Sequence, residues 1–198
     1  MAGDPRIPPI DRPDILIPDA GPLIHLAQAG ALRLLHEIGG AVVIVDMVRH
    51  ELVDDPSKAA AVILQDWIER GLQPGSNSPV RLEVTETGAA YRLARLVQPE
   101  FRMKGGGETA ILEWLGDKID GADHNCIVLY ENGKVPRAIA GQGLDANIDV
   151  LTTRAFLDLA ERRHLIASAE DLWRTIIAAS PTTNPRLAGF SQRRTPET

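Results

Sequence analysis

Short, unbroken runs of apolar residues alternate along the chain with longer stretches in which apolar residues recur at helical spacing. The short runs lie at residues 14–18, after the opening Asp14, and at 42–45 and 126–130. A last strand is predicted at 148–151, where Asp149 interrupts the apolar residues. A short apolar run without alternation is typical of a strand that is buried on both faces of a sheet. Residues 80–84 instead alternate between apolar and charged side chains, which predicts a half-exposed strand.

Helical spacing of apolar residues fills most of the intervals between these strands. The first predicted helix begins near Leu23 and runs to Ile38, where Gly39 and Gly40 end it. Further helices are predicted at residues 47–53, 57–70, 86–97, 108–115, 134–141, 154–164 and 168–179.

The alternation of strands and helices predicts an α/β fold, a three-layer α/β/α sandwich around a short, mostly parallel sheet. We expect the folded domain to span residues 14–180. Residues 1–13 form a proline-rich arm in this interpretation. Residues 181–198 form a flexible tail, because their prolines and their polar and basic residues cannot build a core.

The composition narrows the class of protein. A hydrophobic content of 44% in a chain of 198 residues excludes an intrinsically disordered protein. The single cysteine, Cys126, excludes a disulfide scaffold, because one cysteine cannot form an internal disulfide. We expect no membrane span, because no apolar run has the length that a span needs. The first residues lack the features of a signal peptide. A cytoplasmic protein is therefore expected.

Acidic residues outnumber basic ones, 27 against 21, which gives a formal net charge of −6. The excess lies in the first 150 residues, with 22 acidic and 14 basic side chains. An acidic body argues against a general affinity for nucleic acid, since lysine and arginine dominate phosphate binding. It leaves room for a concentrated acidic site that binds a cation.

Four carboxylate residues occupy positions that a parallel sheet brings to one edge. Asp19 follows the first predicted strand and Glu131 follows the strand at 126–130. Glu51 lies on the helix after the second strand, and Glu108 opens a helix after three glycines. Clustered carboxylates repel one another and need a compensating cation. Carboxylate oxygens suit Mg²⁺ or Mn²⁺, ions that commonly serve phosphate chemistry.

Each of these acids also has a simpler interpretation. Asp19 is a favourable N-cap for the helix that follows it, and Glu108 suits the positive end of a helix dipole. Glu51 could be a solvated charge on a helix surface, and Glu131 could belong to a turn with the asparagine and glycine that follow. The placement of all four at one sheet edge favours a shared site.

The chain resembles the PIN-domain ribonucleases over residues 14–166, through an ordered set of motifs. The first motif is ILIPDAGPLIHLAQAGALRLL, a strand that ends in an acid before a turn of small residues. The others, in order, are VVIVDMVRHELV, GGGETAIL, IVLYENGKVPRAIA and VLTTRAFLDLAERRHL.

This resemblance implies an endoribonuclease that depends on Mg²⁺ or Mn²⁺, with RNA as the substrate. It assigns Asp19, Glu51, Glu108 and Glu131 to the catalytic acid cluster, with Asn132 as a further metal ligand. The best known members are the VapC-like toxins of bacterial toxin–antitoxin pairs. The resemblance therefore also implies a small antitoxin as a partner, and we expect a homodimer as a further arrangement.

The chain departs from the family pattern at three places. Gly21 stands where a hydroxyl residue often lies, two positions after the first acid. The paired acids after the strand at 126–130 are Glu131 and Asn132, and the sequence leaves open which of the two faces the metal. Thr152 and Thr153 stand where some members carry another acid.

Two other functions stay open. Gly21 and Asn132 are compatible with a catalytically weakened PIN-like module that binds RNA or a protein. A phosphotransfer enzyme of the haloacid-dehalogenase type would use Asp19 as its nucleophile, but Gly21 occupies the place of its second aspartate.

Other residues carry weaker signals. The histidines lack paired zinc spacing, and the three glycines at 105–107 lack the lysine of a P-loop. Solvated helix charges are expected for Arg154, Arg162 and Arg163, and a surface position for His50. Core positions are expected for Trp67, Trp114 and Trp173.

Overall fold

A computed structural model describes residues 13–53, 59–118, 125–131, 139 and 147–179. It contains a five-stranded sheet in the order β3-β2-β1-β4-β5, and every pair of neighbouring strands is parallel. The strands are β1 (Ile15–Pro18), β2 (Ala41–Val45), β3 (Val80–Glu83), β4 (Cys126–Leu129) and β5 (Ile148–Leu151). The predicted three-layer α/β/α architecture is confirmed.

The strand order creates a switch point between β1 and β4. The chain moves from β1 to β2 and β3 in one direction, and then returns past β1 to reach β4. Pro18 pairs with Leu129 in the parallel register of these two central strands. In open parallel sheets, ligands bind outside the carboxyl ends of the strands at such a point.

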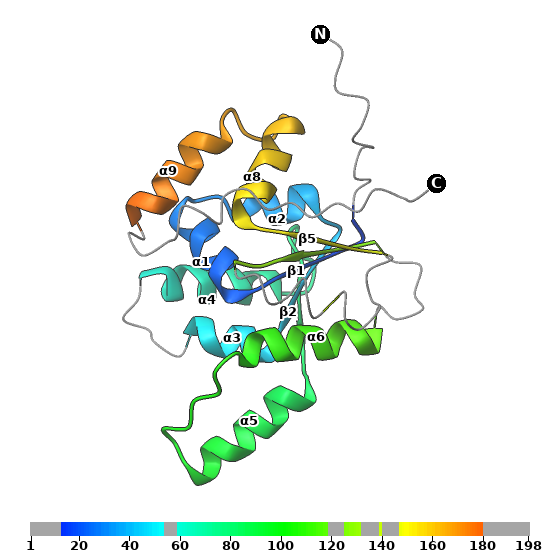
Figure 1. Ribbon diagram of the computed structural model, residues 1–198, viewed down its shortest axis with the longest axis vertical. Helices are drawn as coiled ribbons and strands as arrows, with labels where there is room; N and C mark the ends of the chain where they lie inside the picture. Colours follow the sequence, from blue (N-terminus) through cyan, green and yellow to red (C-terminus); the bar gives the residue numbers. More distant parts are fainter. Residues whose placement is uncertain (1–12, 54–58, 119–124, 132–138, 140–146, 180–198) are drawn as a thin grey trace.

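The helices lie on both faces of the sheet (Figure 1). On one side of the strands, α1 (Ala20–Gln28) contacts α4 (Ala59–Gly71), α8 (Thr153–Arg162) and α9 (Ala169–Ala179). On the other side lies α6 (Gly106–Lys118), drawn in green in Figure 1. The remaining described helices are α2 (Arg33–Ile38), α3 (Asp46–Val53) and α5 (Glu86–Val97).

The single helix predicted at residues 23–38 is wrong. The structure has two helices, and the first begins at Ala20, directly after Asp19. Gly30 separates them at a φ of 63°, a left-handed conformation that glycine adopts without steric cost. The next N–H, of Ala31, donates to the carbonyl of Leu26 at 2.8 Å and closes the end of α1.

The other predicted boundaries differ by one or a few residues. Strand β3 ends at Glu83 and strand β4 at Leu129, each one residue earlier than predicted. The predicted helix at 134–141, the tail at 181–198 and nearly all of the arm at 1–13 lie outside the described residues.

The core follows the apolar pattern of the sequence. Buried side chains of the central strands pack against buried residues of α1, α2, α6 and α8. Trp114 and Trp173 are buried and Trp67 packs against the core, so the core positions predicted for the tryptophans are confirmed. Among the residues that the structure describes, no helix is both long and apolar enough to cross a membrane.

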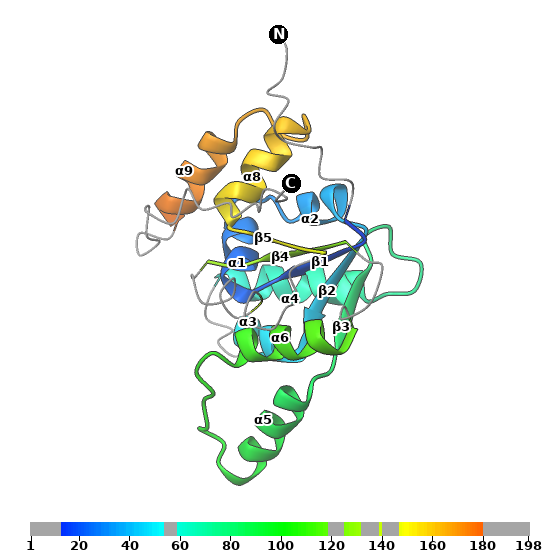
Figure 2. The same cartoon turned by 45° about the vertical axis from the view of Figure 1, so that its right-hand side comes forward.

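Helix α5 stands away from the body in both views and is anchored at its first turns (Figures 1 and 2). The buried carboxylate of Asp46 accepts from the Thr85 hydroxyl at 2.8 Å and pairs with Arg92 at 2.5 Å. Gly88 allows this approach, because a β-carbon there would lie 2.1 Å from Asp46 Oδ2. Glu113 of α6 accepts from the backbone N–H and the hydroxyl of Thr87. Polar contacts therefore fix the base of α5.

The outward face of α5 is apolar beyond this anchor. Leu93, Leu96 and Val97 are 65%, 80% and 88% exposed, so the packing of the domain does not use them.

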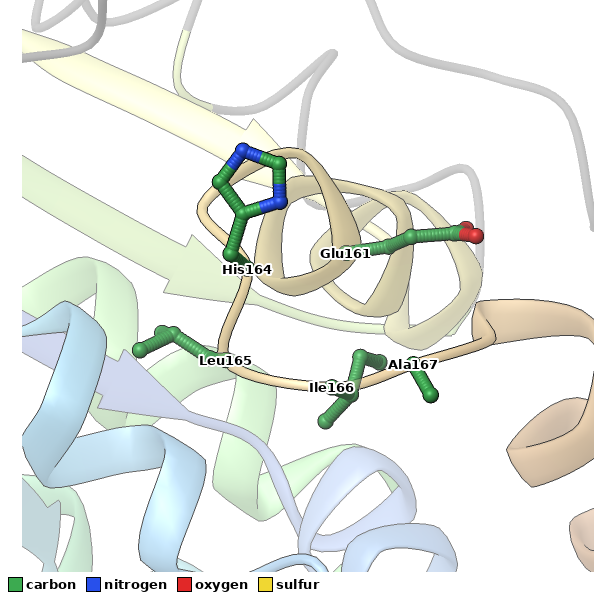
Figure 3. A pocket seen from close by; sticks show the side chains of 5 residues that line it. All are labelled: Glu161, His164, Leu165, Ile166 and Ala167. Atoms are coloured by element: carbon green, nitrogen blue, oxygen red, sulfur yellow. The ribbon is translucent and has the colours of Figure 1, made fainter.

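Helix α8 ends in a left-handed residue that is not glycine. His164 has a φ of 59°, and Figure 3 shows it in the turn after α8, near Glu161. The N–H of His164 donates to the Glu161 carbonyl at 2.9 Å, and the N–H of Leu165 donates to the Ala160 carbonyl at 3.0 Å. The same pair of bonds closes α1 at Gly30, so this turn is a Schellman motif with histidine at the glycine position.

We expect His164→Gly to raise the free energy of unfolding by about 0.5–1 kcal/mol. The steric penalty that the histidine β-carbon meets in the left-handed conformation is larger than the destabilisation caused by the greater entropy of glycine in the unfolded chain. Urea unfolding of the two proteins measures this difference. Gly30→Ala is the matched control and should lower stability, since nothing lies within 4 Å of its β-carbon position and only the backbone conformation is tested. A destabilised His164→Gly protein would contradict the explanation.

Candidate functional site

Asp19 lies at the switch point of the sheet. Its N–H donates to the carbonyl of Leu129 at 2.8 Å, which continues the pairing of β1 with β4 by one residue. Asp19 occupies the N-cap position of α1, but its side chain makes no capping hydrogen bond. The capping interpretation therefore does not account for the carboxyl group of Asp19.

Glu51 reaches the same region from α3. Its Oε1 accepts the N–H of Gly107, at the start of α6, at 2.9 Å. A β-carbon at Gly107 would lie 3.1 Å from Glu51 Oε1 and 3.3 Å from Asp19 Oδ1. Glycine at this position thus lets the helix start approach two carboxyl groups from separate segments.

Glu108 lies in the first turn of α6, immediately after Gly107. Its Oε2 is 3.7 Å from the β-carbon position of Gly105, which has a φ of 72°. The left-handed Gly105 ends the segment from α5 and directs the chain into α6, so the glycines set the place of Glu108. The stabilising effect of the helix dipole also applies to Glu108 at this position.

Glu131 follows β4 by two residues and approaches α1 and α8. Its Oε1 lies 3.1 Å from His25 Nδ1, and the Thr153 hydroxyl donates to the same oxygen. A β-carbon at Gly21 would lie 3.0 Å from Glu131 Cγ. The absence of a hydroxyl side chain at position 21 therefore makes room for the side chain of Glu131.

The other three carboxyl groups influence the protonation of Asp19. Burial is the largest cause that raises the pKa of Asp19 from 3.8 to about 6, and the negative charges of Glu51, Glu108 and Glu131 raise it further. The N–H of Ala20 acts in the opposite direction. A rise of this kind is expected where carboxylates lie close together without a cation.

The pKa of Glu51 is also raised. Desolvation of its carboxyl group by the surrounding elements is the main cause, and the charge of Glu108 adds to it, while the hydrogen bond from Gly107 lowers it. Part of the Glu51 side chain still reaches solvent. This edge of the sheet therefore combines a half-buried acid, Asp19, with an exposed one, Glu51.

The donor set suits a hard divalent cation, because Asp19, Glu51, Glu108 and Glu131 offer only oxygen atoms. The raised pKa values of Asp19 and Glu51 mark negative charge that a cation would neutralise. Within the described part of the chain, no group of three or more histidine, cysteine or acidic side chains is arranged so that it could hold a metal ion as the structure stands. Asn132 lies outside the described residues.

Two residues near this cluster were not predicted as site residues, although Thr153 was noted as a departure from the family pattern. His25 and Thr153 both contact Glu131, and both are buried. A signal for each was present, because His25 lies one helical turn after Gly21 and Thr153 follows the end of β5. Neither signal specifies a contact with Glu131, which depends on the packing of α1 and α8 beside β4.

The remaining candidates lie elsewhere. Arg154 pairs with Asp158 and Glu170 and its side chain is 18% exposed, so the solvated charge expected there is instead a half-buried, ion-paired one. The surface position expected for His50 is wrong in part, since its half-buried ring packs against Tyr91 with the centroids 5.4 Å apart. Two surface hollows, one beside α5 and one around His164 (Figure 3), include none of the four clustered acids.

Comparisons of the chain with protein-family models, with curated proteins and with solved structures find no match. The fold and the acid cluster are therefore the observations on which a function can be argued.

We expect Asp19→Asn to stabilise the metal-free protein at neutral pH by about 1–3 kcal/mol, because the variant removes a carboxylate whose charged form is unfavourable in the folded state. The rise of the Asp19 pKa from 3.8 to about 6 sets the upper limit of this unfavourable free energy at about 3 kcal/mol. Between these two pH values the folded state holds more protons than the unfolded state. The contribution of Asp19 to stability is thus present below this range and is lost as the pH rises through it.

Thermal unfolding in the presence of a chelator, measured across this pH range, tests the prediction. The difference between Asp19→Asn and the parent protein should be small at the acidic end and largest above a pH of about 6. Asp66→Asn is the control, because Asp66 is an exposed acid that pairs with Arg70 on α4. If Asp19→Asn unfolds at the parent temperature throughout, Asp19 is not held in an unfavourable environment.

Proposed function

We propose that this protein is a metal-dependent endoribonuclease of the PIN type, which hydrolyses phosphodiester bonds in RNA. The observation that carries the proposal is the meeting of carboxylates from separate segments at the switch point of a parallel sheet. Asp19 and Glu51 both flank Gly107, and the charges of Glu108 and Glu131 act on Asp19. The motifs that resemble the PIN-domain ribonucleases supply these same acids.

Asp19, Glu51, Glu108 and Glu131 would hold one or two Mg²⁺ or Mn²⁺ ions. The resemblance adds Asn132 as a candidate oxygen ligand, a role that the variants below test against Glu131. Such an ion, when bound, activates water and neutralises the charge that develops on a phosphate. The protein's own part is to keep several carboxylates close together and partly out of water, so that binding a cation relieves their repulsion.

The acid cluster also determines the order of events. Four carboxylates repel an anionic RNA backbone, because both carry negative charge and phosphate binding depends on positive charge. RNA binding at this edge therefore requires the cation. A dependence of RNA affinity on Mn²⁺ follows from this, in addition to a dependence of cleavage.

We expect the parent protein to bind Mn²⁺ in isothermal titration and to cleave structured RNA only when the ion is present. Glu51→Gln and Glu108→Gln should each weaken Mn²⁺ binding about tenfold or more, because each removes an anionic oxygen from a hard-cation site. Glu69→Gln on the exposed side of α4 is the matched control and should bind as the parent does. A folded parent protein that binds no Mn²⁺ would sink the proposal.

The contacts of Glu131 support it as the metal-facing member of the pair with Asn132. We therefore expect Glu131→Gln to abolish RNA cleavage and Asn132→Asp to change Mn²⁺ affinity by no more than about twofold, since only the former alters a ligand charge. Titration of Mn²⁺ into both variants measures the affinities, and an RNA cleavage assay measures the activity of Glu131→Gln. Much tighter binding by Asn132→Asp would instead assign the metal-facing role to position 132.

A second candidate is a catalytically weakened PIN-like module that binds RNA or a protein without cleaving RNA. It is favoured by the finding that, among the described residues, no three acidic, histidine or cysteine side chains are arranged so that they could hold a metal ion. A protein that binds RNA equally with a chelator and with Mn²⁺ would support this candidate over the nuclease.

Partners other than RNA belong to the proposal as well. A small antitoxin or a second copy of the chain would need an exposed apolar surface, and the outward face of α5 offers Leu93, Leu96 and Val97. Size-exclusion chromatography with light scattering gives the oligomeric state directly.

A further inference from the structure

Two hydrogen-bond donors from separate helices meet on one oxygen of Glu131. His25 of α1 places Nδ1 3.1 Å from Oε1, and the hydroxyl of Thr153, the first residue of α8, donates to the same atom. An ionised carboxylate only accepts hydrogen bonds, so Nδ1 is the donating nitrogen of His25. Within the described part of the chain, both hydrogen bonds of this carboxylate therefore end on Oε1.

The path of the Glu131 side chain is restricted as well. Its Cγ and Cβ pass over Gly21, where a β-carbon would lie 3.0 Å and 3.5 Å away. With the stem against α1 and Oε1 held by two donors, Oε2 is the oxygen left to face a cation. Asp19 lies near enough for the charge of Glu131 to raise the pKa of Asp19.

We propose that His25 and Thr153 are positioning residues, which hold Glu131 Oε1 so that Oε2 is presented to the divalent cation. This inference rests on the proposed metal-dependent function, and it assigns to the two residues a role that the motif comparison did not. Donors behind a ligating carboxylate fix its orientation, and loss of such a donor typically weakens metal binding by about 10- to 100-fold.

The surroundings of both donors fit a fixed orientation. The ring of His25 meets Trp173 of α9 edge to face, with the centroids 6.3 Å apart and the planes at 88°. Trp173 is buried, and so are His25 and Thr153. Thr153 is further fixed because the preceding residue, Thr152, caps α8 by accepting the N–H of Ala155 at 3.2 Å. Packing thus fixes the positions of His25 and Thr153, and with them the directions of their hydrogen bonds to Glu131 Oε1.

The experiment compares variants that remove a donor with variants that restore it. His25→Leu and Thr153→Val keep much of the side-chain volume but lose the donor, whereas His25→Asn and Thr153→Ser keep one near the original atom. Isothermal titration of Mn²⁺ into the full chain at one neutral pH should show about tenfold or more weaker binding for the first pair. The second pair should recover most of the affinity.

A control and a double variant separate positioning from general stability. His36→Leu removes another packed imidazole, which lies against Trp67 with the centroids 5.6 Å apart, and should leave Mn²⁺ affinity unchanged even if the melting temperature falls. If His25 acts through Glu131, His25→Leu should have no further effect on Mn²⁺ affinity in a Glu131→Gln background.

The outcomes distinguish this inference from the proposed function. A parent protein that binds Mn²⁺, with His25→Leu and Thr153→Val binding equally well, overturns the positioning role and leaves the function standing. A loss that persists in the Glu131→Gln background overturns it too, because His25 would then act by another route. A folded parent protein that takes up no Mn²⁺ overturns both.

Discussion

The parallel pairing of β1 with β4 is the constraint on which the rest of the structure depends. The register that joins Pro18 to Leu129 places the next residues, Asp19 and Tyr130, level with each other just beyond the carboxyl ends of the two strands. Glu131 follows directly, and the end of β5 brings Thr153 beside it through the pairing of Leu129 with Leu151. A shift of one residue in either register would move the acid of one strand to the other face.

The acid cluster lowers the stability of the folded state, and the rest of the fold compensates for this loss. Asp19 is half-buried near other carboxylates, which favours its protonated form and opposes folding at neutral pH. A large core of central strands and helices offsets this cost. Sites that bind charged ligands commonly keep such strain, because the ligand relieves it and thereby gains affinity.

Comparison of Asp46 with Asp19 shows how environment decides the role of a carboxylate. Each follows a central strand, β2 or β1, directly. Asp46 accepts from Thr85 and pairs with Arg92, so its charge is satisfied and it fixes the base of α5. Asp19 has other acids as its electrostatic neighbours, so its charged form is disfavoured and its pKa is raised. The same residue type after a strand thus serves structure in one case and supports a candidate site in the other.

The sequence by itself determined the layered fold, because short apolar runs between amphipathic helices can bury their surface only as a covered parallel sheet. It also singled out Asp19, Glu51, Glu108 and Glu131, since the ends of parallel strands share one edge. Local pattern could not divide the first helix at Gly30, where a left-handed turn and not a loss of hydrophobicity ends α1. Only the tertiary structure decided that Gly21 and Gly107 admit carboxylates and that His25 and Thr153 meet on Glu131, because these contacts join segments that are distant along the chain.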